Sequence, residues 1–220
     1  VESRAIRVEA SRDDAERLMS GRSPLGAEDP EPAALPSRLT VTFGFGPGLF
    51  DAIGRPAECP TVIRDLPAFP TDRLEERWSG GDLLVQVCSD DAVALSYAVR
   101  RIVQDARGLA TVRWTQRGFG PARGSEPPGT TPRNLFGQRD GSANPAPGAE
   151  LDDAVWVRDG PDWFVGGTML VLRRIRMDVD IWDDFGRAGK EMSTARRLDD
   201  GAPLTGGGEF DDVAPTVVDG

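Results

Sequence analysis

Alternation of apolar and polar residues predicts four strands in the first 120 residues. These candidate strands cover residues 5–9, 39–43, 82–88 and 109–119. Apolar residues recur at helical spacing between Ala92 and Arg107, with arginines on the opposite side, which predicts a helix. A shorter polar helix is predicted over Arg12–Met19, with Ser11 as its cap. The order strand, helix, strand, strand, helix, strand is typical of a ferredoxin-like α+β unit, an antiparallel sheet with helices on one face.

The pattern becomes weaker after the Pro- and Gly-rich linker from Gly120 to Pro132. A strong apolar run predicts a strand over Thr168–Ile175, which would open a second unit of the same kind. A weaker helix is predicted over Arg187–Arg197, and the acidic, glycine-rich stretch Asp199–Gly220 is expected to be poorly ordered. We therefore predict a first ferredoxin-like half over 1–132, a connecting segment over 133–165, and an incomplete second half over 166–220.

Composition excludes several classes of function. The net charge of −10 argues against a nucleic-acid partner, because phosphate binding needs clustered Lys and Arg. No apolar run is long enough to cross a bilayer. The 220 residues include two cysteines and no histidine, which excludes a structural zinc site and every Ser-His or Cys-His nucleophile. The chain starts at Val1 without a methionine, so we expect a processed or trimmed product.

Two short patterns have ordinary explanations. Gly44–Gly48 follows a strand but lacks a third glycine in the register of a dinucleotide loop, because the sixth position is Leu49, and Pro47 interrupts it. Acidic pairs such as Asp152–Asp153 are typical of solvated turns, with glycosidase chemistry as the remote alternative.

The most informative stretch runs from Asn134 to Pro145, NLFGQRDGSANP. It places one carboxylate, Asp140, in a glycine-flanked turn with the pattern Gly137-x-x-Asp140-Gly141. As a bare pattern this is also explained by an Asp side chain bonded to its own backbone.

Together with its flanks, this stretch resembles the GxxDG signature of dye-decolorizing peroxidases, the heme enzymes that include deferrochelatase-type members. The resemblance extends over about residues 38–204. It is carried by the segments 42–51, 65–70, 81–88, 112–119, 166–183 and 201–204. It implies two ferredoxin-like halves with heme b between them.

The resemblance also implies roles for individual residues. Asp140 would be the distal acid–base residue that takes a proton from H2O2 and returns it to the leaving oxygen. Gly141, Ser142 and Ala143 would lie against the heme, where small side chains allow close approach. The implied partners are H2O2 and a small-molecule reductant that is a dye or a phenol. The family leaves the compartment open, because relatives are exported or packaged in protein shells.

One departure from the family leaves two hypotheses open. The family's iron is held by a histidine from the second half, and this chain has none, so no metal ligand is predicted in it. The chain is then either part of a heme peroxidase or a heme-free relative that acts as a scaffold or association module. We expect little peroxidase turnover from the chain alone. An open sheet edge and apolar surface would favour homo-oligomers.

Overall fold

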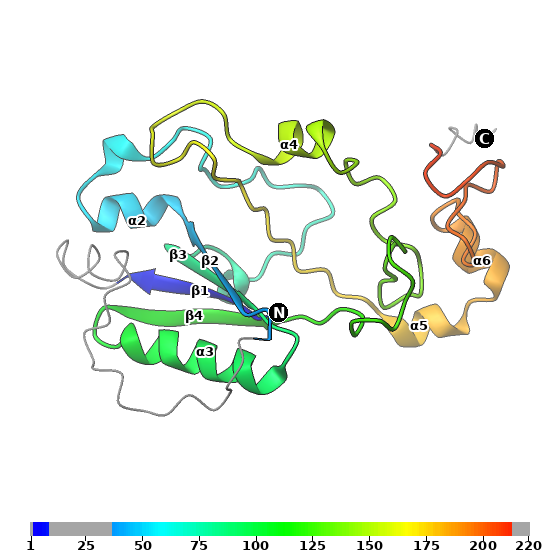
Figure 1. Cartoon of the computed structure of the whole chain (residues 1–220), viewed down its shortest axis with the longest axis horizontal. Helices are drawn as coiled ribbons and strands as arrows, with labels where there is room; N and C mark the ends of the chain where they lie inside the picture. Colours follow the sequence, from blue (N-terminus) through cyan, green and yellow to red (C-terminus); the bar gives the residue numbers. More distant parts are fainter. Residues whose placement is uncertain (1, 9–36, 213–220) are drawn as a thin grey trace. The chain divides into compact units, whose positions relative to one another are not determined.

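The computed structural model describes residues 2–8 and 37–212, and the chain divides into two compact units (Figure 1). Unit 1 comprises Val1–Phe119 and Val157–Leu170; unit 2 comprises Gly120–Trp156 and Val171–Gly220. The strands are β1 (Glu2–Val8), β2 (Thr40–Phe45), β3 (Leu83–Cys88) and β4 (Ala110–Arg117). The helices are α2 (Pro47–Ala52), α3 (Ala92–Asp105), α4 (Ala149–Val155), α5 (Val179–Asp184) and α6 (Arg187–Met192), with 3-10 turns η1 (Pro56–Glu58) and η2 (Glu76–Trp78).

The four strands of unit 1 form an antiparallel sheet in the order β2-β3-β1-β4. β1 lies at its centre, where Ala5 pairs with Leu84 of β3 on one side and Trp114 of β4 on the other. This is the strand order of a ferredoxin-like unit, so the predicted fold class is confirmed for the first half. Four predicted strands and the long helix match β1–β4 and α3. The polar helix predicted over Arg12–Met19 lies outside the described residues.

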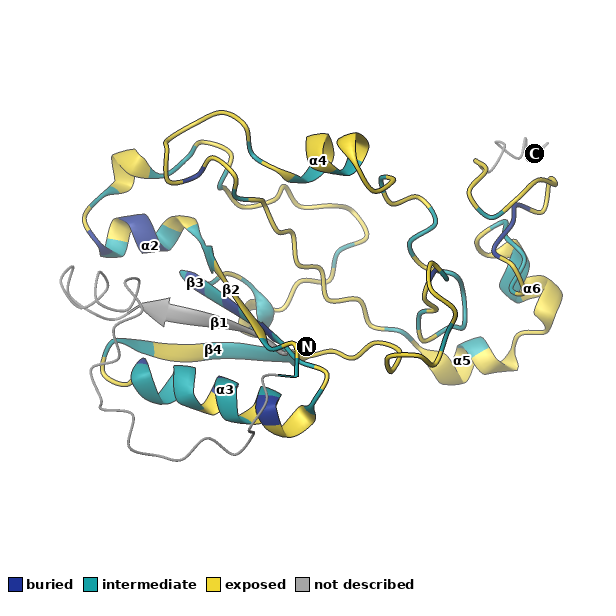
Figure 2. Cartoon of the chain, in the orientation of Figure 1, coloured by how far each residue is buried: buried dark blue, intermediate teal, exposed yellow. Residues whose placement is uncertain are grey.

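The core of unit 1 lies against one face of β3. Leu83, Val85 and Val87 are buried and alternate with partly buried neighbours, as a strand's two-residue period requires. Figure 2 shows β3 partly in the dark blue of buried residues. Leu49 beside them comes from α2, and Val99 comes from α3. α3 starts where the Asp91 carboxylate accepts a hydrogen bond from the Ala94 backbone N–H at 2.8 Å, an N-cap that the sequence pattern did not identify.

A short helix, α2, follows the glycines at the end of β2. α2 begins at Pro47, whose fixed φ and missing N–H suit the first helical position. Gly46 precedes it because a Cβ there would collide with the Gly81 carbonyl oxygen. Trp163 packs beside α2, with its ring centroid 5.7 Å from that of Phe50. The turn residues therefore serve close packing in unit 1.

Unit 2 has no strand among its described residues and is built from short helices and turns. The predicted strand Thr168–Ile175 is wrong: no described strand pairs with it, and Ile175 is 75% exposed. An apolar run becomes a strand only where another backbone supplies its hydrogen bonds. In the described part of the chain, no helix has the length and apolar character to span a bilayer.

Two further expectations for unit 2 are corrected. The helix predicted over Arg187–Arg197 ends at Met192, because Ala195 adopts a left-handed φ of 54°. The stretch from Asp199 to Asp212 is not poorly ordered, since the Arg196 guanidinium holds the carbonyls of Glu209 and Asp211 at 2.7 and 2.9 Å. Residues 213–220 lie outside the described part.

Truncation of Leu49 tests the core of unit 1. Leu49 is 1% exposed, so Leu49→Ala removes buried methyl groups and should cost about 2–5 kcal/mol in the free energy of unfolding. Leu74 is 75% exposed, and Leu74→Ala should change stability by less than about 0.5 kcal/mol. Urea denaturation of both variants measures the difference, and equal losses would show that Leu49 does not belong to the core.

The left-handed backbone of Ala195, after α6, can be tested by substitution. A left-handed backbone costs an L-residue about 1–2 kcal/mol, so Ala195→Gly should stabilise the chain by about 0.5–1 kcal/mol after the greater flexibility of the unfolded glycine is included. Ala154→Gly, inside α4, is the matched control and should destabilise by about 1 kcal/mol. Thermal unfolding distinguishes these opposite signs; destabilisation by both substitutions would contradict the left-handed conformation at Ala195.

Candidate functional site

The turn that presents Asp140 is held by an asparagine at its start. The Asn134 side-chain oxygen accepts hydrogen bonds from the backbone N–H of Phe136 at 3.0 Å and of Gln138 at 3.2 Å. Gly137 donates its N–H to the Asn134 carbonyl at 2.9 Å and has a φ of 76°, which favours glycine. Such a side chain mimics a turn of backbone. Asn134, rather than Asp140, is therefore the residue that closes the turn.

The carboxylate of Asp140 is exposed, and no described residue makes a hydrogen bond or ion pair with it. The backbone of Asp140 is fixed, because its N–H donates to the Pro132 carbonyl at 2.9 Å. The preceding residue, Arg139, forms an isolated antiparallel bridge with Arg133. The alternative that Asp140 bonds its own backbone is thus wrong. The turn holds its position and leaves the carboxylate free to act.

The three residues after Asp140 are the predicted heme contacts, and they continue the same turn. Gly141 has a φ of 130°, and a Cβ there would lie 3.1 Å from the Asn144 side-chain nitrogen, so a larger residue is disfavoured. Ser142 donates its hydroxyl to a Glu209 carboxylate oxygen at 3.1 Å. Ala143 is exposed. Their small side chains suit close approach of a flat ligand.

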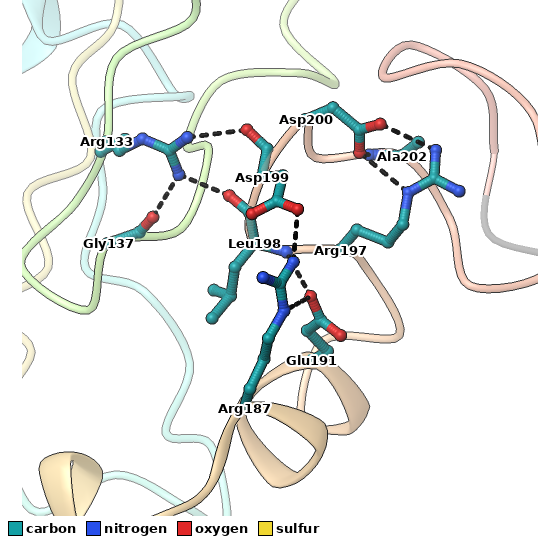
Figure 3. A network of polar contacts seen from close by, with 9 residues as sticks. All are labelled: Arg133, Gly137, Arg187, Glu191, Arg197, Leu198, Asp199, Asp200 and Ala202. Carbon is teal, nitrogen blue, oxygen red and sulfur yellow. Dashed lines mark hydrogen bonds and ion pairs between the residues drawn. The ribbon is translucent and has the colours of Figure 1, made fainter.

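Arg133 joins this turn to a segment far along the chain (Figure 3). Its guanidinium donates to the Gly137 carbonyl at 2.6 Å, to the Leu198 carbonyl at 2.6 Å and to the Asp199 carbonyl at 2.8 Å. One planar side chain therefore fixes both the turn and residues more than sixty positions later. Sequence analysis missed this role, although Arg133 directly precedes the motif.

Trp182 of α5 adds a second contact to the turn. Its ring stacks on Phe136 with centroids 4.5 Å apart and 20° between the planes. Its indole N–H donates to the Phe136 carbonyl at 3.0 Å. Through this stack and this hydrogen bond, Trp182 supports the motif turn.

A cavity of about 290 Å³ lies beside Asp140 within unit 2. Its wall is mostly polar. It is lined by Asn134, Gln138, Arg139, Asp140, Thr194, Arg196, Arg197, Leu198 and Gly201. The motif turn and the segment that Arg133 holds therefore enclose one site, which is the candidate functional site.

Acid–arginine pairs fix the segment after α6 (Figure 3). Arg197 pairs bidentately with Asp200 at 3.0 and 2.8 Å, and this hydrogen bonding, with a further bond from the Ala202 backbone N–H, lowers the pKa of Asp200 to about 2. The same Asp200 contact raises the pKa of Arg197. Hydrogen bonds first to Asp199 and then to Glu191 raise the pKa of Arg187.

The ligands that iron would need are not gathered at this site. Among the described residues, no group of three His, Cys, Asp or Glu side chains could hold a metal ion. The chain has no histidine, and Cys59, Cys88 and Tyr97 belong to unit 1, whereas Asp140 belongs to unit 2. The residues present therefore supply an exposed carboxylate and a turn of small residues, but they do not supply the histidine nitrogen that would hold a heme iron.

Acid titration tests the Arg197–Asp200 pair. The folded-state pKa of Asp200 lies below its unfolded value of about 3.9, so its contribution to stability is present above about pH 4 and is lost as pH falls toward 2. Arg197→Gln should return the pKa of Asp200 toward about 3.9, measured by carbon NMR of its carboxyl group. Arg123→Gln, at an exposed position elsewhere in unit 2, should leave it near 2. An unchanged Asp200 in Arg197→Gln would refute the pairing.

Comparison with known proteins gives consistent matches along the chain. Residues 4–120 match the N-terminal model of Dyp-type peroxidases, and residues 131–217 match the C-terminal model. The dye-decolorizing peroxidase of Thermobifida fusca (strain YX) is 43% identical over 191 residues, which are 84% of this chain and 44% of that protein. The deferrochelatase of Escherichia coli (strain K12) is 32% identical over 176 residues, 77% of this chain and 42% of that protein.

Solved structures also match this chain in fold and in sequence. The DyP-type peroxidase from Cellulomonas bogoriensis superposes with a TM-score of 0.86 at 43% identity, covering 97% of this chain and 63% of that one. The matches to the Thermobifida fusca peroxidase and the Escherichia coli deferrochelatase cover less than half of the length of those two proteins. Because the N-terminal family model alone matches more than half of the 220 residues and the C-terminal model matches most of the rest, the chain belongs to the Dyp-type peroxidase family.

Proposed function

We propose that this chain serves a heme-dependent peroxidase that reduces H2O2 and oxidises dyes or phenolic compounds, with Asp140 as its acid–base residue. Dyp-type peroxidases are enzymes, and heme b is their cofactor. The observation that carries the proposal is a fixed turn presenting an exposed carboxylate without a described partner, at the family motif. A carboxylate in that condition can accept a proton without first breaking another contact.

The proposed work of Asp140 is to move one proton. It would take a proton from one oxygen of H2O2 and return it to the other oxygen, which then leaves as water. The complete reaction consumes two electrons and two further protons from the reductant and yields two waters. Heme, when bound, supplies the redox-active iron; the residues described here position the peroxide and handle its proton.

The residues after Asp140 would form the surface next to the cofactor. We propose that Gly141, Ser142 and Ala143 face the heme, supported by their small size and by the left-handed φ at Gly141. Ser142 has its hydroxyl bound to Glu209, so it would contribute shape more than hydrogen bonding. The division into 1–132, 133–165 and 166–220, with an incomplete second half, stays a prediction.

A heme-free role is the second candidate, favoured by the absence of histidine in the chain. In this role the chain would be a scaffold or association module. The apolar run 169–175 supports self-association into homo-oligomers, because its large side chains are exposed. A saturable shift of the Soret band during hemin titration favours the enzyme, and weak, unsaturable binding favours the module.

Substitution of Asp140 tests the catalytic proposal. The chain loaded with hemin, with imidazole added as an external axial ligand, is assayed for dye oxidation by H2O2 against a hemin–imidazole blank. Asp140→Asn should lower the turnover above that blank by about 100-fold or more, since a positioned acid–base group contributes that much. Its thermal unfolding should not change, because no described contact is lost.

Asp65→Asn is the matched control, because Asp65 is exposed in unit 1 and undergoes the same change of charge. Equal turnover in the two variants would refute the role of Asp140. Turnover that depends on Asp140 without imidazole would mean that a residue other than histidine binds the iron.

A further inference from the structure

One carboxylate oxygen on α6 accepts two hydrogen bonds and joins the helix to the segment that follows it (Figure 3). The Glu191 Oε1 atom accepts the Arg187 Nε–H at 3.0 Å and the Leu198 backbone N–H at 3.0 Å. The Glu191 side chain is 15% exposed, so water has little access to compete for these bonds. Hydrogen bonds to an ionised acceptor are stronger than bonds between neutral groups, so this carboxylate holds the Leu198 backbone firmly.

Leu198 is held at both of its backbone polar groups. Its N–H donates to Glu191, and its carbonyl accepts a hydrogen bond from the Arg133 guanidinium at 2.6 Å. The same guanidinium donates to the Gly137 carbonyl of the motif turn at 2.6 Å. Consecutive contacts therefore connect Glu191 to the motif turn through one backbone residue and one arginine side chain.

A second route connects the same two ends. Arg187, which is bound to Glu191, also forms an ion pair with the Asp199 carboxylate, and the Asp199 carbonyl accepts from Arg133 at 2.8 Å. The side chains of Arg187 and Asp199 are 57% and 70% exposed, so solvent screens their ion pair. The route through the Leu198 backbone is therefore the stronger one, and both routes begin at Glu191 and end at Arg133.

We propose that Glu191 is a positioning residue for the motif turn and, through the turn, for Asp140. Glu191 acts through Leu198 and Arg133, so removal of its carboxylate loosens the contact that fixes the Gly137 carbonyl. All of these residues belong to unit 2. The catalytic part of this inference rests on the proposed function of Asp140, whereas the effect on the turn does not require heme.

Hydrogen exchange of backbone amides in the full chain, without heme, tests the effect on the turn. The N–H groups of Gly137 and Gln138 donate to Asn134, so their exchange rates report how far the turn is closed. Glu191→Ala should raise both rates by about tenfold, since it removes the charge-assisted bond that holds Leu198. Equal rates in the wild type and in Glu191→Ala overturn the proposal.

Glu150→Ala is the matched control. Glu150 lies in α4 of the same unit, carries the same charge and also accepts a hydrogen bond from a backbone N–H, that of Ala146 at 3.2 Å. Within the described residues, no contact joins Glu150 to Arg133. The Glu150→Ala chain should therefore exchange its Gly137 amide at the wild-type rate, and a rate as high as that of Glu191→Ala overturns the proposal.

Two substitutions of similar size keep the test valid if Glu191→Ala unfolds the chain. Glu191→Gln retains a side-chain oxygen that can accept the Leu198 N–H, and it should preserve most of the protection of Gln138. Glu191→Met fills a similar volume without a strong acceptor, and it should lose that protection. Equal protection in the two variants would show that packing, rather than the acceptor, supports the turn, and it overturns the proposal.

A double-mutant cycle separates the route through Arg133 from a general loss of stability. In the Arg133→Gln chain the route is already broken, so the further change Glu191→Ala should leave the exchange of Gln138 as it is. Additive effects of the two substitutions would mean that Glu191 does not act through Arg133, and they overturn the proposal.

Turnover measures the catalytic part separately. In the hemin–imidazole assay, Glu191→Ala should lower kcat above the blank by about tenfold, because a misplacement of about 1 Å can cost about 100-fold in rate. The KM for the dye should stay unchanged, and the substitution should have no further effect in the Asp140→Asn chain. A change in KM alone overturns the positioning of Asp140. If Asp140→Asn itself leaves turnover unchanged, the proposed function fails, while the exchange rates still decide whether Glu191 holds the turn.

Discussion

Hydrogen bonds from arginine side chains to backbone carbonyls are what the fold of unit 2 depends on. In unit 1 the sheet satisfies the backbone, but the described residues of unit 2 include no strand that could do so. Arg133 and Arg196 each bind three backbone carbonyls instead, drawn from two different stretches of the chain. A guanidinium can do this because its donors lie in a rigid plane, whereas a lysine is a flexible point charge.

The residues that support the motif turn are different from the residue that would carry out the chemistry. Arg133 and Trp182 hold the turn through the carbonyls of Gly137 and Phe136, and Asn134 closes it. None of these contacts uses the Asp140 carboxylate. The residue that would exchange protons is therefore free to do so, while its backbone is fixed from several directions. A site arranged in this way tolerates a change in the charge of Asp140 without loss of its geometry.

The sequence was informative where structure is local and less so where it depends on distant partners. β3 and α3 were predicted because their apolar spacing matches their own periodicity. The run Thr168–Ile175 has an equally good strand pattern and forms no strand, because pattern alone cannot supply a pairing backbone. The motif identified Asp140, but the role of Arg133 could not be predicted. Its acceptors are carbonyls up to 66 positions away, and every residue type has a carbonyl.

The arginines of unit 2 differ in the groups that they bind. The chain as a whole carries a charge of −10, which repels anions at long range. At physiological ionic strength that repulsion is screened within about 8 Å, so short-range contacts decide binding. Arg197 pairs with the Asp200 carboxylate, whereas Arg139 and Arg196 donate to backbone carbonyls. The segment after α6 is therefore held by two kinds of arginine contact, ion pairs with acids and hydrogen bonds to backbone carbonyls, and neither kind uses the Asp140 carboxylate.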